Sequence, residues 1–189
     1  VIKDANIIHV GSLMLREEEG RRLATKIFEI AKKENKLISF DVNFRDDIFP
    51  SFEVAKQIYT EYIKNADILK FSIDEVKLFT GNDDCSSISS LVRDDQLVFI
   101  TLGSKGSYLK YKDIKLKVDS IKIKAIDTTG AGDAFYACVL RYLDELTLAD
   151  INLDEMKNIL KKANLCGALA CGKKGAISSL PSLKDLEEF

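Results

Sequence analysis

The stretch Asp127-Thr-Thr-Gly-Ala-Gly-Asp-Ala-Phe135 joins an extended segment to a strongly apolar helix. Its glycines let the backbone N–H groups at the start of that helix, from Gly130 to Asp133, approach an anion closely. These N–H groups lack partners within the helix and point toward the same place as the positive end of the helix dipole. Seven of the ten glycines lie in the second half of the chain. We therefore expect a phosphate-binding site in this half.

Asp133 stands beside this expected anion site, where a carboxylate would repel a phosphate if binding were its only task. Its presence is explained if Asp133 accepts a proton from an acceptor hydroxyl while the amides stabilise a phosphoryl group in transfer. An acidic residue in a first turn also complements the helix dipole, and Asp133 alone would favour that simpler interpretation. Two glycines, two threonines and Asp127 in the same turn favour catalysis.

The sequence before this stretch alternates between short apolar runs and helical patterns. The apolar runs predict strands at residues 7–10, 37–40, 66–71 and 97–102. Apolar residues at helical spacing predict helices at residues 17–34, 54–63 and 72–79. Strands that alternate with helices in this way predict an α/β fold with a central, mostly parallel sheet flanked by helices.

The pattern changes after Gly103. Short, closely spaced runs at 106–111, 114–118 and 121–125 predict an antiparallel strand series before the catalytic helix. Two helices are expected next, at residues 131–146 and 155–171. The sequence shows no repeat, low-complexity tract or linker, so residues 1–189 are expected to form one compact unit.

The composition excludes several classes of protein. The chain is 46% hydrophobic and 31% charged with a net charge of −2, which argues against intrinsic disorder and a disulfide scaffold. We expect no nucleic-acid partner, because the charge is near neutral, and no membrane partner, because no apolar run approaches roughly 20 residues. The four cysteines lack metal-ligand spacing, which favours reduced thiols and a cytoplasmic protein.

Several motifs carry a family resemblance. Residues 127–135 resemble the signature of the PfkB, or ribokinase-like, family of carbohydrate kinases. Asp41-Val-Asn43-Phe-Arg45 resembles the family's DxNxR, and Thr101-Leu-Gly-Ser-Lys-Gly106 resembles its TLGxxG. Asn164 followed by Gly172-Lys-Lys-Gly-Ala176 is similar to its nucleotide-pocket region, and residues 70–75 resemble the fructokinase form of its NxxE motif, with Ser72 replacing the Asn. The resemblance runs over essentially the whole chain and implies a ribokinase-like fold.

The resemblance assigns roles in catalysis and sugar binding. It makes Asp133 the catalytic base, and it makes Gly130, Ala131 and Gly132 the anion hole for the transferred phosphoryl group. The residues it places at the substrate are Asp133, Asp41, Asn43 and Arg45. The alternative for Arg45 is a solvated loop arginine, which the fixed alternate positions of Asp41 and Asn43 disfavour.

The resemblance also implies ATP and Mg²⁺ as cofactors. Ser72 and Glu75 would belong to the water network around Mg²⁺, with Glu75 holding the ion through water, as suits hard carboxylate oxygens. Ser72 and Glu75 also fit a plain capping box, and one pair serves both purposes only if the helix start faces the phosphates. The implied nucleotide-binding residues are Ser72, Glu75, Thr101, Gly103, Gly106, Gly130, Gly132, Asn164 and Gly175.

A monovalent cation site, such as one for K⁺, is a further implication where the family feature is retained. It would use Asp127, backbone oxygens near Thr129, Ala170, Lys173 and Gly175, and Ser179.

The resemblance implies ATP-dependent phosphorylation of a sugar hydroxyl, with fructose to fructose 6-phosphate as the leading reaction. Another sugar or a nucleoside as acceptor, and a non-catalytic nucleotide-binding fragment, stay open. The chain begins at Val1 without Met and shows no counterpart of the family's N-terminal lid. We therefore expect residues 1–189 to be the C-terminal, nucleotide-binding and catalytic part of a single kinase domain, weak or inactive alone. The lid is the family's usual dimerisation element, so a homodimer is considered only for the full-length protein.

Overall fold

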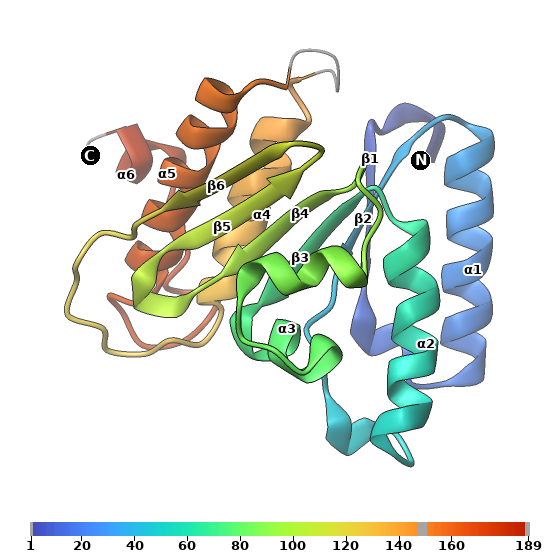
Figure 1. The fold of residues 1–189 in the computed structure, drawn as a ribbon. Helices are drawn as coiled ribbons and strands as arrows, with labels where there is room; N and C mark the ends of the chain where they lie inside the picture. The colour runs from blue at the N-terminus through green and yellow to red at the C-terminus, as the bar shows by residue number, and fades with distance from the viewer. Residues whose placement is uncertain (1, 147–150, 188–189) are drawn as a thin grey trace. The chain divides into compact units, whose positions relative to one another are not determined.

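The computed structural model describes residues 2–146 and 151–187, so Val1 and the tail at 188–189 lie outside the described residues. Six strands form one sheet in the order β1-β2-β3-β4-β5-β6 (Figure 1). The strands are β1 (Ile7–Gly11), β2 (Leu37–Asp41), β3 (Ile68–Ser72), β4 (Leu97–Thr101), β5 (Ser107–Tyr111) and β6 (Ile114–Val118).

Helices alternate with the first four strands and then follow the sheet. The helices are α1 (Glu18–Lys33), α2 (Phe52–Asn65), α3 (Ile73–Thr80), α4 (Ala131–Leu143), α5 (Leu153–Ala170) and α6 (Leu183–Glu187). The α/β class and the mostly parallel sheet flanked by helices are confirmed. Within the described residues, no helix is both long and apolar enough to cross a bilayer.

The contacts divide the chain into two compact units, which are described separately. The first unit comprises Val1–Ile100 and Leu109–Ile114, and the second comprises Thr101–Tyr108 and Lys115–Phe189. The expectation that residues 1–189 belong to a single kinase domain stays a prediction.

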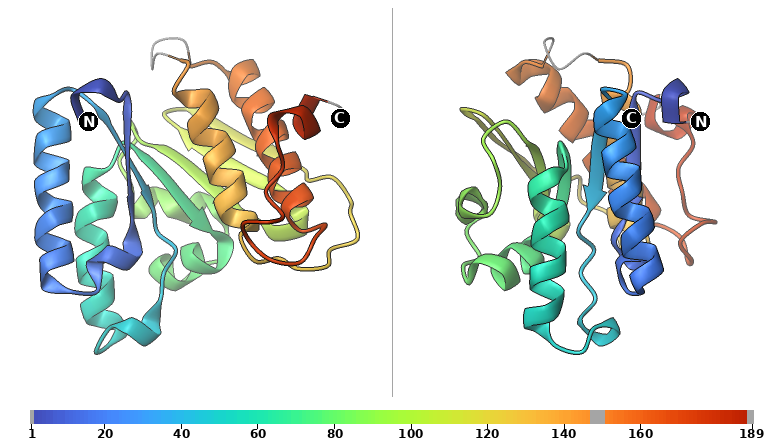
Figure 2. Two further views of the ribbon diagram at one scale, coloured as in Figure 1. Left: turned by 180° about the vertical axis from the view of Figure 1, so that it is seen from behind. Right: turned by 90° about the vertical axis from the view of Figure 1, so that its right-hand side faces the viewer.

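In the first unit, β1, β2 and β3 are parallel, and Asp41 of β2 stands opposite Lys70 of β3. The strands read as apolar runs because they are buried, as Ile38, Phe40 and Leu69 show with 0% exposure. Helices α1 and α2 lie side by side in every view (Figures 1 and 2).

Strands β5 and β6 are joined by the two residues Lys112 and Asp113, and Lys112 has φ +50°. A two-residue turn with positive φ is typical of an antiparallel hairpin, as the sequence predicts. The third strand expected at 121–125 is wrong, because the structure has no strand there.

An alternating apolar pattern forms a strand only where a partner edge is available. Here Ile121 and Ile123 are each 38% exposed. The next residues are tied to the end of α5 instead, since the N–H groups of Ile126 and Asp127 donate to the Cys171 carbonyl at 2.8 and 3.3 Å.

In the second unit, α4 and α5 pack together (Figure 2). Gly167 of α5 permits this close approach, because a Cβ there would lie 3.1 Å from the carbonyl oxygen of Ala131. Buried Phe135 and Val139 of α4 and Leu160 of α5 form part of this core. The start of α4 is therefore held firmly against α5.

Candidate functional site

The N-terminus of α4 is the centre of the predicted phosphate site. Gly130 is its N-cap residue, with φ +80° and ψ 0°, and no side chain caps the helix. A Cβ at Gly130 would lie 3.1 Å from Cβ of Ala176 and would have to adopt a left-handed conformation. Glycine is thus required here. The Ala131 N–H donates to the Thr128 carbonyl at 3.2 Å, and no side chain caps the first turn of α4.

Asp133 is exposed and lies in the first turn of α4. Gly130, Ala131 and Gly132 occupy the same helix end, so the structure brings the predicted base and the predicted anion hole together. The positive end of the helix dipole attracts an anion at the same place.

Asp127 fastens the loop before α4. Its Oδ1 accepts hydrogen bonds from the N–H and the hydroxyl of Thr129 at 3.0 and 2.7 Å, and its Oδ2 accepts one from the N–H of Gly175 at 3.0 Å. Donors to the charged form favour it, so these bonds lower the pKa of Asp127 to about 2. The carboxylate thus joins the loop at 127–130 to the loop that follows α5.

The other residues of the expected monovalent cation site lie around this junction. Gly175 has φ +93°, Lys173 is exposed, and Ala170 is buried at the end of α5. Ser179 is 4% exposed and its hydroxyl donates to the Ala176 carbonyl at 3.0 Å. The described residues contain no cluster of three or more His, Cys, Asp or Glu side chains that could hold a metal. A cation here would depend on backbone oxygens.

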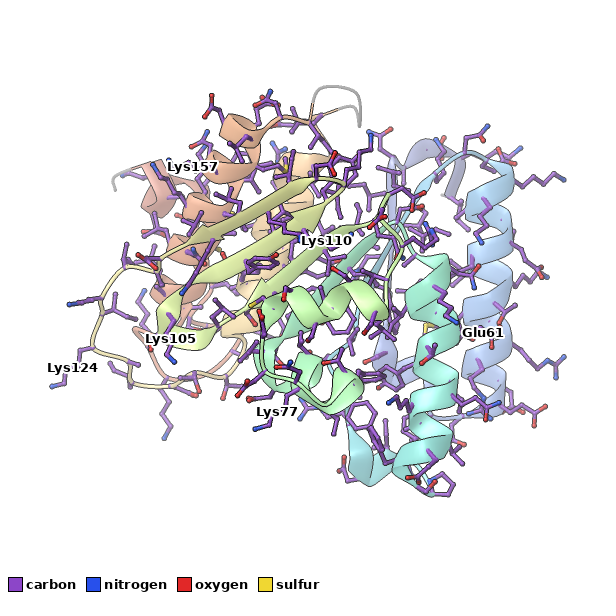
Figure 3. The ribbon with its side chains drawn as sticks, viewed as in Figure 1. Glu61, Lys77, Lys105, Lys110, Lys124 and Lys157 are labelled. Atoms are coloured by element: carbon purple, nitrogen blue, oxygen red, sulfur yellow. The ribbon has the colours of Figure 1, made fainter. Side chains whose placement is uncertain are left out.

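Thr101 ends β4, and Gly103 and Gly106 lie in the turn that follows, with φ +59° at Gly103 and +95° at Gly106. A Cβ at Gly106 would lie 2.0 Å from the Val118 carbonyl oxygen, so this turn packs directly on the backbone after β6. Lys105, between the two glycines, is exposed (Figure 3).

Asn164 approaches the same backbone from α5. It is 6% exposed, and its Nδ2 donates to the carbonyls of Val118 and Asp119 at 3.0 and 3.4 Å. Asn164 and Gly106 therefore both lie against the backbone at residues 118–120. The Asn164 amide supports that backbone directly.

In the first unit, Ser72 and Glu75 form the capping box at the start of α3. The Ser72 hydroxyl accepts from the Glu75 N–H at 3.2 Å, and Glu75 Oε2 accepts from the Ser72 N–H at 2.6 Å. Glu75 Oε1 also accepts from the Phe44 N–H at 2.6 Å. Glu75 therefore holds the segment that carries the DxNxR residues, a function beyond capping.

Asp41, Asn43 and Arg45 lie in and just after β2. Asp41 is buried, and its carboxylate contacts Lys70 Nζ at 3.0 Å. Asn43 has φ +30°, and Arg45 is exposed. Arg45 is thus the member of this motif whose charge is available at the surface.

Two residues that support this segment lie within the quoted motifs but are given no role by them. Phe44 packs against Tyr59 and Phe79, with ring centroids 5.1 and 5.5 Å apart. Lys70 is the charged residue inside an otherwise apolar strand run, and that interruption is the signal that could have identified it.

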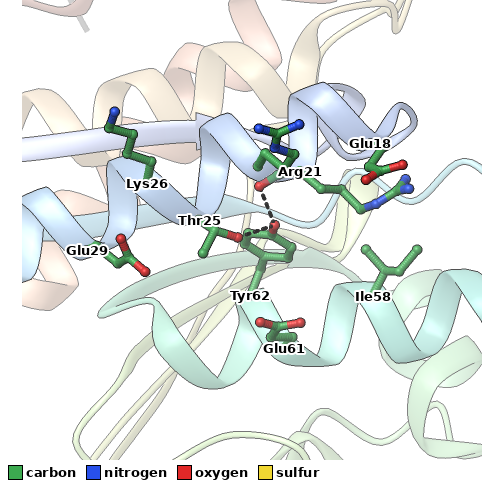
Figure 4. Close-up of a pocket in the computed structure, with 9 residues that line it drawn as sticks. Glu18, Arg21, Thr25, Lys26, Glu29, Ile58, Glu61 and Tyr62 are labelled. Carbon is green, nitrogen blue, oxygen red and sulfur yellow. Dashed lines mark hydrogen bonds between the residues drawn. The ribbon is translucent and has the colours of Figure 1, made fainter.

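A separate groove of about 600 Å³ runs between α1 and α2 (Figure 4). The Tyr62 hydroxyl bonds Thr25 there and donates to the Arg21 carbonyl at 3.0 Å, while the Arg21 guanidinium donates to the Leu15 carbonyl. None of the residues predicted from sequence lines this groove, and six of its nine lining residues are charged, with both signs present.

Residues 1–183 match the pfkB family of carbohydrate kinases. Fructokinase-1 of Oryza sativa subsp. japonica is 37% identical over 187 residues, which make up 96% of this chain and 57% of the rice protein.

Two solved structures are similar over nearly the whole chain. The fructokinase of Vibrio cholerae O395, bound to fructose, ADP and calcium, has a TM-score of 0.89 at 30% identity over 98% of this chain and 60% of its own. The aminoimidazole riboside kinase of Salmonella enterica, bound to aminoimidazole riboside and an ATP analogue, has a TM-score of 0.86 at 25% identity over 96% of this chain and 61% of its own. The chain thus spans somewhat more than half the length of these relatives.

Proposed function

The chain belongs to the pfkB family of carbohydrate kinases, and from that premise we propose that the protein transfers a phosphoryl group from ATP to a sugar hydroxyl. We propose fructose as the acceptor and fructose 6-phosphate as the product. Both the rice relative and the protein in the Vibrio structure are fructokinases, which supports this choice of sugar.

The observation that carries the proposal is the uncapped start of α4. Gly130 leaves the first N–H groups of the helix without a side-chain cap, and Asp133 is exposed in the same turn. In the proposed reaction, these N–H groups stabilise the charge on the phosphoryl group in transfer. Asp133 accepts the proton of the attacking sugar hydroxyl, which makes that oxygen a better nucleophile.

The first unit supplies the proposed sugar contacts through the segment at 41–45. Arg45 is exposed and offers a planar set of donors suited to hydroxyl or phosphate oxygens. Asn43 follows the buried Asp41 and stands at a constrained backbone position. We assign direct contact with the substrate to Asn43 and Arg45.

The residues present fit a Mg²⁺ ion that is held through water. Glu75 accepts one backbone N–H on each carboxylate oxygen, and each oxygen of an ionised carboxylate can accept about two hydrogen bonds. Glu75 can therefore orient a water of the ion while it caps α3. When bound with ATP, Mg²⁺ neutralises phosphate charge.

We further propose that residues 1–189 form the nucleotide-binding and catalytic part of one kinase domain, with low activity for this chain alone. The greater length of the relatives supports this proposal. A potassium-type site at Asp127 and a homodimer of the full-length protein belong to the same proposal. We also propose a reducing, cytoplasmic location, because the spacing of the four cysteines in the sequence favours reduced thiols.

The test compares Asp133→Asn with Asp154→Asn in the longest form of the protein that its gene encodes. Both residues are exposed acids in the first turn of a helix, so both changes remove the same favourable interaction with a helix dipole. Loss of a catalytic base lowers kcat by about 10²- to 10⁴-fold, whereas the control retains parental turnover. Equal turnover for the two variants, with ATP and fructose, would refute the assigned base.

The acceptor is tested with a panel of sugars and nucleosides assayed with ATP and Mg²⁺. The highest kcat/KM is expected for fructose. A higher value for a nucleoside would instead place the protein with the aminoimidazole riboside kinase. Nucleotide binding by calorimetry without phosphate transfer to any acceptor would favour the non-catalytic alternative.

A further inference from the structure

Among the described residues, one ion pair has both side chains buried, and it joins β2 to β3. Asp41 and Lys70 are each 6% exposed, and Lys70 Nζ lies 3.0 Å from Oδ1 of Asp41 and donates to Oδ2 at 3.2 Å. The other buried lysine paired with a carboxylate is Lys110, but its partner Asp94 has a side chain that is 91% exposed. The Asp41–Lys70 pair is therefore unlike the surface pairs of this chain.

The stability of the sheet does not explain this pair. Desolvation of two buried charges offsets most of their attraction, and an apolar pair of similar volume is often as stable. The neighbours of Lys70 in β3, Leu69 and Phe71, are both 0% exposed, so an apolar side chain would suit this strand. The presence of two buried charges at this position therefore requires another explanation.

The pair lies where β2 ends and the segment with Asn43 and Arg45 begins. The N–H of Val42 donates to the Lys70 carbonyl at 3.1 Å, so β3 holds both the side chain and the backbone at this point. Asn43 has φ +30°, a sparsely populated conformation that persists only when the surroundings hold it. Its carbonyl accepts from the buried Ser12 hydroxyl at 3.2 Å.

We propose that Asp41 and Lys70 are a positioning pair that fixes the direction in which Asn43 and Arg45 leave the sheet. The pair sets the affinity for the sugar while neither charge touches it, an inference that rests on the proposed function. Both oxygens of the buried Asp41 carboxylate lie against Lys70. In this proposal Asp41 supports the sugar site and does not bind the sugar, which differs from the role that the family resemblance gives it.

The test replaces the pair with an uncharged pair of similar volume, Asp41→Asn with Lys70→Met. Three quantities are compared with the parent: the thermal midpoint, hydrogen exchange of the 42–45 segment, and the KM for fructose and for ATP. We expect a thermal midpoint near the parental value and exchange at 42–45 that is faster by about tenfold, with β4 unchanged. The KM for fructose is expected to rise about tenfold, while the KM for ATP stays within about twofold.

Lys110→Met is the matched control, because it removes a lysine whose side chain is only 3% exposed and that bonds a carboxylate away from this segment. It should leave exchange at 42–45 and both KM values at the parental level. If the double variant does not fold, Asp41→Glu replaces it, since this change keeps both charges and moves the carboxylate relative to Lys70 by one methylene group. Exchange at 42–45 and the KM for fructose are expected to change in the same directions, by smaller factors.

Parental exchange at 42–45 in a folded variant overturns the proposal, as does an unchanged KM for fructose. Hydrogen exchange can be measured without catalytic turnover, so it tests this inference independently of the proposed function. If the parent phosphorylates no sugar, the proposed function fails, and the exchange comparison alone decides whether the pair positions residues 42–45.

Discussion

Substitution of Gly130 by alanine should damage both the stability and the activity of the protein. The residue has φ +80° and ψ 0°, where alanine costs about 1–2 kcal/mol. The new Cβ would also lie 3.1 Å from Cβ and 3.3 Å from Cα of Ala176, and overpacking of this kind adds about 1 kcal/mol or more. The expected loss in the free energy of unfolding is therefore about 2–4 kcal/mol.

Gly81 provides a control for the backbone term alone. It has φ +79° and ψ 3°, almost the conformation of Gly130, but a Cβ there would meet nothing within 4 Å. Gly81→Ala should thus cost only about 1–2 kcal/mol. The two variants are compared by urea denaturation, with the free energy of unfolding extrapolated to water.

A double-mutant cycle with Ala176→Gly isolates the contact. Removal of the Ala176 methyl group should recover about 1 kcal/mol of the loss in Gly130→Ala, beyond the effect of Ala176→Gly in the parent. The new methyl group must displace the 175–177 loop or the first turn of α4. Displacement of that turn should lower kcat by about 10- to 100-fold. Equal losses for Gly130→Ala and Gly81→Ala, with no coupling to Ala176, would refute this reasoning.

Two further predictions concern the polar residues of the loops. The pKa of Asp127 is lowered to about 2, whereas the pKa of an unperturbed Asp is about 4. Its hydrogen bonds to Thr129 and Gly175 therefore stabilise the folded loop fully above about pH 4, and this stabilisation is lost as the pH falls toward 2. Protection of the Gly175 amide from hydrogen exchange, relative to its intrinsic rate at each pH, should report this loss, and Asp127→Asn should show low protection at every pH. Ser72→Ala removes the cap of α3 and should cost about 1 kcal/mol, as Ser51→Ala should at the start of α2. Ser72→Ala alone should raise the KM for MgATP, and equal kinetics for the two variants would leave Ser72 only a capping role.

Much of the fold could be predicted because burial imposes simple patterns. The run Leu37 to Phe40 has no alternation, and it forms a strand with both faces covered. Gly81 ends α3 in a left-handed conformation, as glycine after a helical pattern indicates. Such signals are local, so a single sequence contains them.

The error at 121–125 shows where local signals fail. Alternation of Ile and Lys favours a strand, but pairing depends on a partner edge that the local sequence does not describe. The backbone at Ile126 and Asp127 instead bonds to Cys171, 45 and 44 residues further along the chain. Contacts at that distance are set by the packing of α5.

The sequence predicts which residues belong to the candidate site, but it does not predict the hydrogen-bond and ion-pair partners of those residues. Asp127 is identified by motif, yet its bonds to Thr129 and Gly175 depend on how the loop after α5 returns. No role is predicted for Lys70, because its position opposite Asp41 appears only when β2 and β3 are paired in register. Sequence spacing along one segment cannot report a contact between two strands.

The polar residues of the motifs therefore divide by what their side chains contact. Four of them bond to the protein itself and hold backbone segments or a buried partner in place: Asp41, Glu75, Asp127 and Asn164. Asp133 and Arg45 are exposed, as their proposed roles in catalysis and substrate binding require. A single substitution in the first group should lower stability and activity together, since the same contact serves both; for Asp41 this holds while Lys70 is retained, because the lysine then stays buried and unpaired. Substitution of Asp133 or Arg45 should lower activity with little change in stability, because exposed side chains contribute little to folding.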